Sequence, residues 1–382
     1  MIYLDNAATS FPKPKCVLEA MCKASLFSAN PGRGGHRLSV KAGETVYKTR
    51  EKAASIFGAD SERVIFTKNC TESLNMVIKG CLKKGDHVII SSLEHNSLLR
   101  PVQKLFEQGV ITYDIAQVVP KNDEQTVMNF QSLIKPNTRL IACCHVSNVF
   151  GTVLPIEKIG LLCREKGILF AVDAAQSAGT FRYDINNSAI DFLCLPGHKG
   201  LLGPMGTGLL ILNQSSQLES FIEGGTGSLS LEPSQPDVLP DKFESGTVNL
   251  PGIAGLYEGL RMVESIGCEN ILKKESRLTE WITSELKNIN GVTVYDNMHS
   301  KIPSGVISFN IGKIHSEQIG ELLDQNNIAC RAGYHCSALA HKSASTIAQG
   351  TVRISPGFFN GINDIKKLIF CINKIAMRQK IW

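Results

Sequence analysis

The stretch DFLCLPGHKGLLGPMGTGLLIL, residues 191–212, places one lysine, Lys199, in an apolar and glycine-rich segment with His198 directly before it. A buried ammonium group is costly unless it is paired, deprotonated or used covalently. A lysine held in a low-dielectric pocket has a lowered pKa and becomes nucleophilic, which suits a Schiff base with an aldehyde. The stretch therefore predicts a chemical role for Lys199.

Apolar runs of strand length alternate with segments of helical period ahead of this stretch. The predicted strands are RVIFT (63–67), HVIISS (87–92), RLIACCHV (139–146) and ILFAVDAA (168–175). Continuous apolar runs, in place of alternating ones, indicate strands that are buried on both faces, as in a parallel sheet covered by helices. The pattern predicts an α/β fold.

The chain has 382 residues, which favours two domains over a single hydrophobic core. From residue 251 a long helical stretch runs to about 290. It is followed by the predicted strands VISFNI (306–311), IACRAG (328–333) and TVRISP (351–356) and by a final helix at 361–378. We therefore expect a large domain over 21–250 and a smaller C-terminal α+β domain over 251–382.

Composition excludes several classes of protein. The net charge of +5 is spread along the chain without a dense basic block, which gives no support for nucleic-acid binding. No apolar run has the length of a membrane span, and MIYLDNAATS lacks the basic start and apolar stretch of a signal peptide, so we expect a cytoplasmic protein. The twelve cysteines are irregularly spaced without a C-x-x-C pair, so we expect neither a disulfide framework nor a metal site.

Polar residues follow four successive predicted strands, where ligands of parallel α/β sheets bind. They are Thr71, with Cys70 before it, then His95, Asn148 and Asp173, with Gln176 three residues on. Taken singly, each has a structural explanation, because Thr71 and Asp173 could be helix N-caps, His95 could be structural and Asn148 could close a turn. Taken together with Lys199, they point to one site.

Pyridoxal phosphate needs a lysine, an acidic partner for its pyridine nitrogen and a cradle for its phosphate. Lys199 and Asp173 provide the first two. The backbone N–H groups of Cys70 and Thr71, with the Thr71 hydroxyl, could hold the phosphate at a helix N-terminus. The sequence therefore predicts that Lys199 anchors pyridoxal phosphate.

Motifs spread over residues 3–336 carry a family resemblance. In chain order they are YLDNAATSFPKP, NPGRGGHRLS, SLEHNSLLRP, SNVFGT, VDAAQSAG, GHKGLLGPMGTG, FESGTVN and RAGYHC. This ordered set resembles the class V aminotransferase superfamily of fold-type I pyridoxal phosphate enzymes, and within it the Suf-type (group II) cysteine desulfurases. The resemblance implies a large cofactor-binding domain with a mainly parallel sheet. It also implies a small C-terminal domain with the catalytic cysteine loop and an N-terminal segment, 1–20, that packs on the small domain.

The resemblance also implies roles for the candidate site residues. Lys199 would bind the cofactor covalently, His95 would stack on its ring, Asp173 would keep the pyridine nitrogen protonated and Gln176 would contact the phenolic oxygen. The implied phosphate ligands are Thr71, His198 and, from the partner subunit of a homodimer, Thr247, beside the backbone N–H of Cys70; the implied substrate ligands are Asn148, Arg353, Arg331 and Arg33. Two positions depart from the family pattern. Pro196 stands where many relatives have a phosphate-binding serine, and Cys70 stands where glycine or threonine is usual.

Cys336 lies directly after His335 and five residues beyond Arg331, in a loop of small and polar residues. A thiol beside positive groups is biased toward the reactive thiolate. The resemblance implies that L-cysteine is converted to L-alanine, with a persulfide on Cys336 that passes to a protein sulfur acceptor. A selenocysteine lyase, a pyridoxal phosphate β-lyase or aminotransferase, and a non-catalytic binding protein with this fold stay open at this point.

Overall fold

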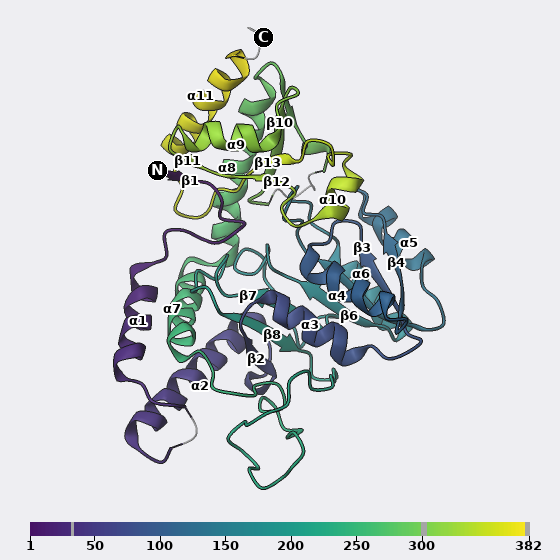
Figure 1. The fold of residues 1–382 in the computed structure, drawn as a ribbon, viewed down its shortest axis with the longest axis vertical. Coiled ribbons are helices and arrows are strands. Elements are labelled where there is room, and N and C mark those ends of the chain that lie inside the picture. The colour runs from purple at the N-terminus through teal and green to yellow at the C-terminus, as the bar shows by residue number, and fades with distance from the viewer. Residues whose placement is uncertain (32–33, 299–303, 379–382) are drawn as a thin grey trace.

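The larger part of the protein is built on a seven-stranded sheet (Figure 1). The structure is a computed structural model that describes residues 1–31, 34–298 and 304–378. The strand order is β2-β8-β7-β6-β5-β3-β4, and the pairs from β7 to β4 are parallel, while β8 is antiparallel to β7 and β2. The strands are Val64–Thr67 (β2), His87–Ser91 (β3), Thr112–Ala116 (β4), Thr138–Cys144 (β5), Leu169–Asp173 (β6), Phe192–Pro196 (β7) and Gly208–Leu212 (β8). The predicted α/β fold with a mainly parallel sheet is confirmed.

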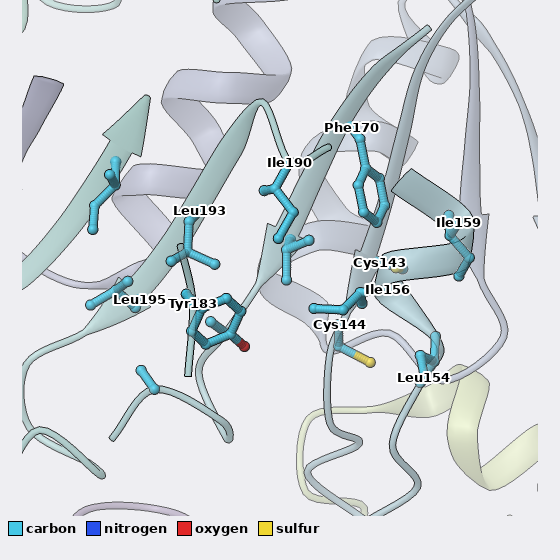
Figure 2. Close-up of a cluster of buried hydrophobic side chains, with 14 of the residues drawn as sticks. Cys143, Cys144, Leu154, Ile156, Ile159, Phe170, Tyr183, Ile190, Leu193 and Leu195 are labelled. Carbon is cyan, nitrogen blue, oxygen red and sulfur yellow. The ribbon is translucent and has the colours of Figure 1, made fainter. Parts of the chain in front are cut away.

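Helices cover both faces of this sheet, as the continuous apolar runs predict. Alternate strand residues enter two separate cores. On one face Ile141, Phe170 and Leu193 pack with α2, α5, α6 and α7, and on the other Leu140, Ala171 and Phe192 pack with α3 and α4. Figure 2 shows part of the first core. The helices are Arg37–Phe57 (α2), Cys70–Cys81 (α3), Asn96–Glu107 (α4), Asp123–Ser132 (α5), Ile156–Lys166 (α6) and Leu250–Ile266 (α7), with a 3-10 turn at Ser61–Arg63.

A smaller unit contains the C-terminal part of the chain. Its antiparallel sheet has the order β12-β13-β10-β9, from Arg331–Gly333 (β12), Thr351–Ile354 (β13), Ile307–Ile311 (β10) and Val292–Val294 (β9). Its helices are Cys268–Lys287 (α8), Ser316–Asp324 (α9), Ala338–Ser343 (α10) and Ile362–Arg378 (α11), and a 3-10 turn spans Asp296–Met298. The apolar faces of α8, α9 and α11 pack with β10 and β13 in one core.

The N-terminus connects the two units. Ile2–Tyr3 (β1) pairs in parallel with Ile328–Ala329 (β11), and Leu4 lies in the core of the small unit. Lys15–Phe27 (α1) then packs against α7 (Figure 1).

The helical stretch expected from residue 251 consists of two helices, because the chain turns at Gly267 with a φ of 85°. α7 adds Leu256 and Leu260 to the core of the large sheet, whereas α8 adds Ile282 to the small core. The domain boundaries stay a prediction.

None of the described helices combines the length and the apolar character that crossing a bilayer requires.

Candidate active site

Asp173 lies at the carboxyl end of β6 and is 3% exposed. Its Oδ1 accepts a hydrogen bond from the Ala175 N–H at 2.8 Å and lies 3.4 Å from the Cys70 sulfur. Its Oδ2 has no hydrogen-bond partner among the residues that the structure describes. The carboxylate is therefore fixed through one oxygen, and the other is available to a bound group.

Lys199 follows β7 in a tight turn that brings it to the same end of the sheet. The backbones approach so closely there that a Cβ at Gly200 would collide with the Ala178 carbonyl oxygen. Burial lowers the pKa of Lys199, and the nearby Asp173 carboxylate opposes that shift. Over the described parts of the chain, its amine has no hydrogen-bond partner. Lys199 therefore has the environment of a nucleophilic amine.

His198 is held by the N-terminal segment. Its carbonyl oxygen accepts from the Ser10 N–H at 3.1 Å, the Thr9 hydroxyl at 2.9 Å and the Lys13 ammonium at 2.7 Å. The ring Nδ1 is buried and has no hydrogen-bond partner, and burial, aided by Lys199 and Lys13, lowers the pKa of His198 to about 4. A buried ring nitrogen without a partner is costly, so it indicates that a bound group contacts it.

His95 is the N-cap of α4, where its Nδ1 accepts from the Ser97 N–H at 3.0 Å. Since Nδ1 is the acceptor, the neutral ring carries its proton on Nε2. Burial lowers the pKa of His95 to about 4, although Asp173 opposes the shift. His95 is therefore neutral near pH 7.

Glu94, for which no role was predicted, is fully buried directly before His95. Its carboxyl group accepts from the Cys144 N–H at 3.0 and 3.1 Å and from the Ser91 hydroxyl, and burial raises its pKa to about 8. These bonds tie the loop that carries His95 to the end of β5. The only signal in the sequence is an acidic residue between Leu93 and His95.

The start of α3 is open to an anion. Asn69 is the N-cap and accepts from the Glu72 N–H at 3.0 Å, so Thr71 is not the N-cap that it could have been. Within the described residues, no protein acceptor binds the N–H of Cys70 or of the exposed Thr71. Free N–H groups at a helix N-terminus favour a phosphate.

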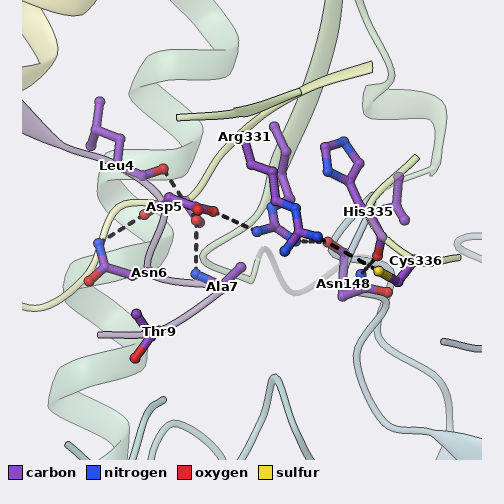
Figure 3. Close-up of polar contacts among 12 residues, drawn as sticks. Leu4, Asp5, Asn6, Ala7, Thr9, Asn148, Arg331, His335 and Cys336 are labelled. Carbon is purple, nitrogen blue, oxygen red and sulfur yellow. Dashed lines mark hydrogen bonds and ion pairs between the residues drawn. The ribbon is translucent and has the colours of Figure 1, made fainter. Parts of the chain in front are cut away.

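The loop that carries Cys336 is bound to Asn148 of the large unit (Figure 3), and its backbone is strained. His335 and Cys336 have φ angles of 50° and 58°, in the left-handed region that non-glycine residues rarely adopt. The Asn96 N–H donates to the Cys336 carbonyl oxygen at 2.8 Å, Asn148 Nδ2 donates to the His335 carbonyl oxygen at 2.8 Å, and Ser337 Oγ donates to Asn148 Oδ1 at 2.6 Å. Cys336 is thereby fixed beside the first residue of α4, next to His95.

The positive charge beside Cys336 comes from Arg331. Its Nη2 donates to the exposed Cys336 sulfur at 3.7 Å (Figure 3). His335 is 3% exposed, its Nε2 lies 3.0 Å from the Thr351 carbonyl oxygen, and burial places its pKa well below the usual range. Burial therefore keeps the His335 ring neutral, and of the two residues named beside Cys336 it is Arg331 that places a positive charge next to the thiol.

Arg353 lies beside Arg331 in the register of β12 and β13 and is 1% exposed. Its Nη2 donates to Asp5 Oδ1 at 2.6 Å and its Nη1 to the Asn148 carbonyl oxygen at 3.0 Å, while Nε is buried without a partner. Asp5 neutralises one of the two guanidinium groups. The pair keeps a net positive charge, and Arg353 Nε is a buried donor without a partner, which suits a carboxylate ligand.

The remaining candidate residues are Gln176, Thr247 and Arg33. Gln176 Nε2 donates to the Ala7 carbonyl oxygen at 2.9 Å, so it is bound to the N-terminal segment. Thr247 is exposed and lines a cavity with Glu72 and Thr207. Arg33 lies outside the described residues. The roles of these residues, and of Asn148 as a substrate ligand, stay predictions.

The residues at the strand ends fit pyridoxal phosphate. Lys199 offers a free amine, Asp173 a free carboxylate oxygen, His198 a buried ring nitrogen without a partner, and the start of α3 free N–H groups. Pro196 has no side-chain donor to offer a phosphate, and its effect on phosphate binding stays a prediction. No group of three or more metal-binding side chains lies within residues 1–31, 34–298 and 304–378.

Comparisons with known proteins agree with this arrangement. The family described as Aminotransferase class-V matches residues 2–368. The probable cysteine desulfurases of Methanothermobacter thermautotrophicus and Pyrococcus abyssi are 35% and 33% identical, each over 98% of this chain and 94% of the relative. The apo structure of a cysteine desulfurase from Thermococcus onnurineus NA1 matches with a TM-score of 0.91 at 33% identity, covering 98% of this chain and 94% of that one. The chain belongs to the cysteine desulfurase family of pyridoxal phosphate-dependent class V aminotransferases.

Proposed function

We propose that this chain takes the sulfur of L-cysteine onto Cys336 as a persulfide, releases L-alanine and passes the sulfur to a protein acceptor. The observation that carries the proposal is the position of the Cys336 sulfur. The sulfur is exposed and lies 3.7 Å from Arg331 Nη2. The loop that carries it accepts a hydrogen bond from the N–H of Asn96, the residue after His95. A pyridoxal phosphate enzyme that only transfers an amino group has no use for such a thiol.

The substrate would be held by its carboxylate. Arg353 has an unused, buried Nε, and Arg331 lies beside it in register, so the two guanidinium groups present donors to one anion. Asp5 compensates one of the two positive charges, which leaves one for the substrate. Because Arg331 also contacts the Cys336 sulfur, a cysteine held by this pair would be bound close to that thiol.

Bound pyridoxal phosphate supplies an aldehyde for the substrate amine and an electron sink for the negative charge that develops at Cα. Asp173 Oδ2 would pair with the pyridine nitrogen, and the neutral ring of His95 would lie on the face of the cofactor. Lys199, whose pKa burial lowers, would take the proton from Cα. His198 Nδ1 and the start of α3 would hold the phosphate.

The transfer of sulfur from L-cysteine to Cys336 needs no oxidant, reductant or other reagent. The Cys336 thiolate attacks the substrate sulfur, a sulfur–sulfur bond forms and the Cβ–sulfur bond breaks. The electron pair of the broken bond stays on the substrate carbon, which takes up a proton, and alanine leaves. L-Cysteine and the enzyme thiol thus become L-alanine and the enzyme persulfide. Attack by an acceptor thiol on the outer sulfur then restores the Cys336 thiolate.

We further propose that the protein is a homodimer in which Thr247 of the partner subunit contacts the phosphate, and that it belongs to the Suf-type group. The exposed position of Thr247 supports the first point, and the short segment between Cys336 and Arg353 supports the second. A reducing compartment such as the cytoplasm suits a chain in which all twelve cysteines are free thiols.

The test compares the wild-type holoenzyme with Cys336→Ala and Cys330→Ala. Cys330 is a suitable control because burial raises its pKa to about 12, so it stays protonated close to the site. Alanine and persulfide are measured with L-cysteine, and L-selenocysteine is tested in parallel. We expect alanine release from cysteine by the wild type and by Cys330→Ala, and its loss in Cys336→Ala.

Other products would overturn the proposal. Alanine from selenocysteine alone, with Cys336→Ala still active, would identify a selenocysteine lyase. Pyruvate and ammonia in place of alanine would identify a β-lyase.

A further inference from the structure

Cys70 is the first residue of α3, and its buried thiol faces the Asp173 carboxylate. Sγ lies 3.4 Å from Asp173 Oδ1. Burial raises the pKa of Cys70 well above its usual range, and the charge of Asp173 adds to this shift. The thiol therefore keeps its proton and is the donor to the carboxylate.

Two donors thus share one oxygen of Asp173. The Ala175 N–H reaches Oδ1 from the turn after β6 at 2.8 Å, and Cys70 reaches it from α3. Both donors stabilise the ionised carboxylate, and together they define its rotation about the Cβ–Cγ bond. That rotation decides how Oδ2 is presented to the pyridine nitrogen of a bound cofactor.

We propose that Cys70 is a positioning residue, whose thiol holds the Asp173 carboxylate in the orientation that pairs with the pyridine nitrogen of pyridoxal phosphate. A glycine at this position would provide no side-chain donor, whereas a cysteine or a threonine provides one. The proposal depends on cofactor binding and is independent of the sulfur step at Cys336.

A matched control is available in Cys194. It is a buried cysteine of the same core cluster and lies opposite Asp173 in the register of β6 and β7. No described residue makes a hydrogen bond with its thiol. Removing the Cys194 sulfur therefore tests packing around Asp173, whereas removing the Cys70 sulfur also removes the donor.

The experiment measures pyridoxal phosphate binding to wild type, Cys70→Ala, Cys70→Ser and Cys194→Ala. The readouts are the dissociation constant, by titration of cofactor-free protein, and the induced circular dichroism of the bound cofactor, which reports a fixed ring orientation. A modest hydrogen bond corresponds to an effect of about 3- to 10-fold. We expect Cys70→Ala to weaken binding by that factor and to lower the dichroism for each bound cofactor. Cys70→Ser should restore both readouts, and Cys194→Ala should stay within about twofold of wild type.

Two results would overturn the proposal: unchanged cofactor binding in Cys70→Ala, or equal losses in Cys70→Ala and Cys194→Ala, which would indicate packing alone. If Cys70→Ala does not fold, Cys70→Val replaces it, because valine fills the site without a donor, and the same loss is expected. Neither readout needs desulfurase activity, so failure of this inference is distinguishable from failure of the proposed function.

Discussion

Arg353 and Asp5 form an ion pair between the two ends of the chain, with Nη2 2.6 Å from Oδ1. The Arg353 side chain is 1% exposed and that of Asp5 is 20% exposed. The same N-terminal segment holds His198 through Thr9, Ser10 and Lys13. The first thirteen residues therefore hold both a candidate substrate ligand and the segment that carries Lys199.

Asp5→Asn should destabilise the protein and weaken substrate binding. Removing one partner of a buried ion pair leaves the other charge uncompensated, and the cost here should be about 2 kcal/mol, below that of a fully buried pair because Asp5 is partly exposed. Urea unfolding of the holoenzyme measures the loss, and KM for L-cysteine should rise with it. Glu165→Gln, which breaks the exposed pair with Lys166, should change little. Equal stability of Asp5→Asn and wild type would contradict this account.

Arg331→Gln should slow the reaction of Cys336 with an electrophile. The guanidinium group donates to the sulfur and places a positive charge beside it. Loss of a hydrogen bond to a charged group costs about 1.5–3 kcal/mol, or about 10- to 100-fold in rate. This is the upper range for the expected effect, because the contact is exposed to solvent. The measurement is the rate of iodoacetamide labelling at Cys336, read by peptide mass spectrometry without substrate. Cys22, exposed on α1, is the internal reference and should not change. Labelling of Cys336 at the wild-type rate would rule out this role for Arg331.

The sequence predicted those site residues whose chemistry is unusual for their surroundings. Lys199 stood out as a charge in an apolar segment, Asp173 as an acid after an apolar strand, and Cys336 as a thiol in a polar loop. The four strands predicted ahead of Lys199 are present, because continuous apolar runs are a local property. β4 was not predicted, since it lies at the edge of the sheet and its half-exposed residues form no such run.

Contacts between distant parts of the chain could not be predicted in this way. Asp5 and Arg353 are separated by 348 positions, and Cys70 and Asp173 by 103. His335 stands next to Cys336 in the sequence, but its ring turns toward Thr351 because the backbone adopts two left-handed conformations in succession. Tertiary packing, and not the spacing in the sequence, decides which residues face each other.

Ser337→Ala should loosen the loop that carries Cys336. The fully buried Ser337 hydroxyl donates to Asn148 Oδ1 at 2.6 Å, and Asn148 in turn holds the His335 carbonyl oxygen. Left-handed conformations of non-glycine residues cost about 1–3 kcal/mol each and persist only when surrounding contacts hold them. We expect faster amide hydrogen exchange over 334–338 and a severalfold lower kcat, with unchanged affinity for pyridoxal phosphate. Ser343→Ala, which removes a hydrogen bond from α10 to the Ser92 carbonyl oxygen, is the control. Unchanged exchange and kcat in Ser337→Ala would show that Asn148 holds the loop without it.

Glu94→Gln should change how stability depends on pH. Burial raises the pKa of Glu94 from 4.5 to about 8, so the folded protein keeps this proton over a range in which the unfolded chain loses it. Where the folded state binds more protons, the free energy of unfolding falls as the pH rises, here by up to about 1.4 kcal/mol per pH unit between pH 4.5 and 8. Glutamine keeps an acceptor for the Cys144 N–H and has no proton to lose. The Tm of Glu94→Gln minus the Tm of the wild type, measured at each pH, should therefore rise from pH 5 to 8 and level off above that range. Glu107→Gln, at the exposed far end of α4, is the control for the loss of one carboxylate. A Tm difference that stays constant across this range would mean that Glu94 is ionised in the folded protein and is stabilised by its three hydrogen bonds.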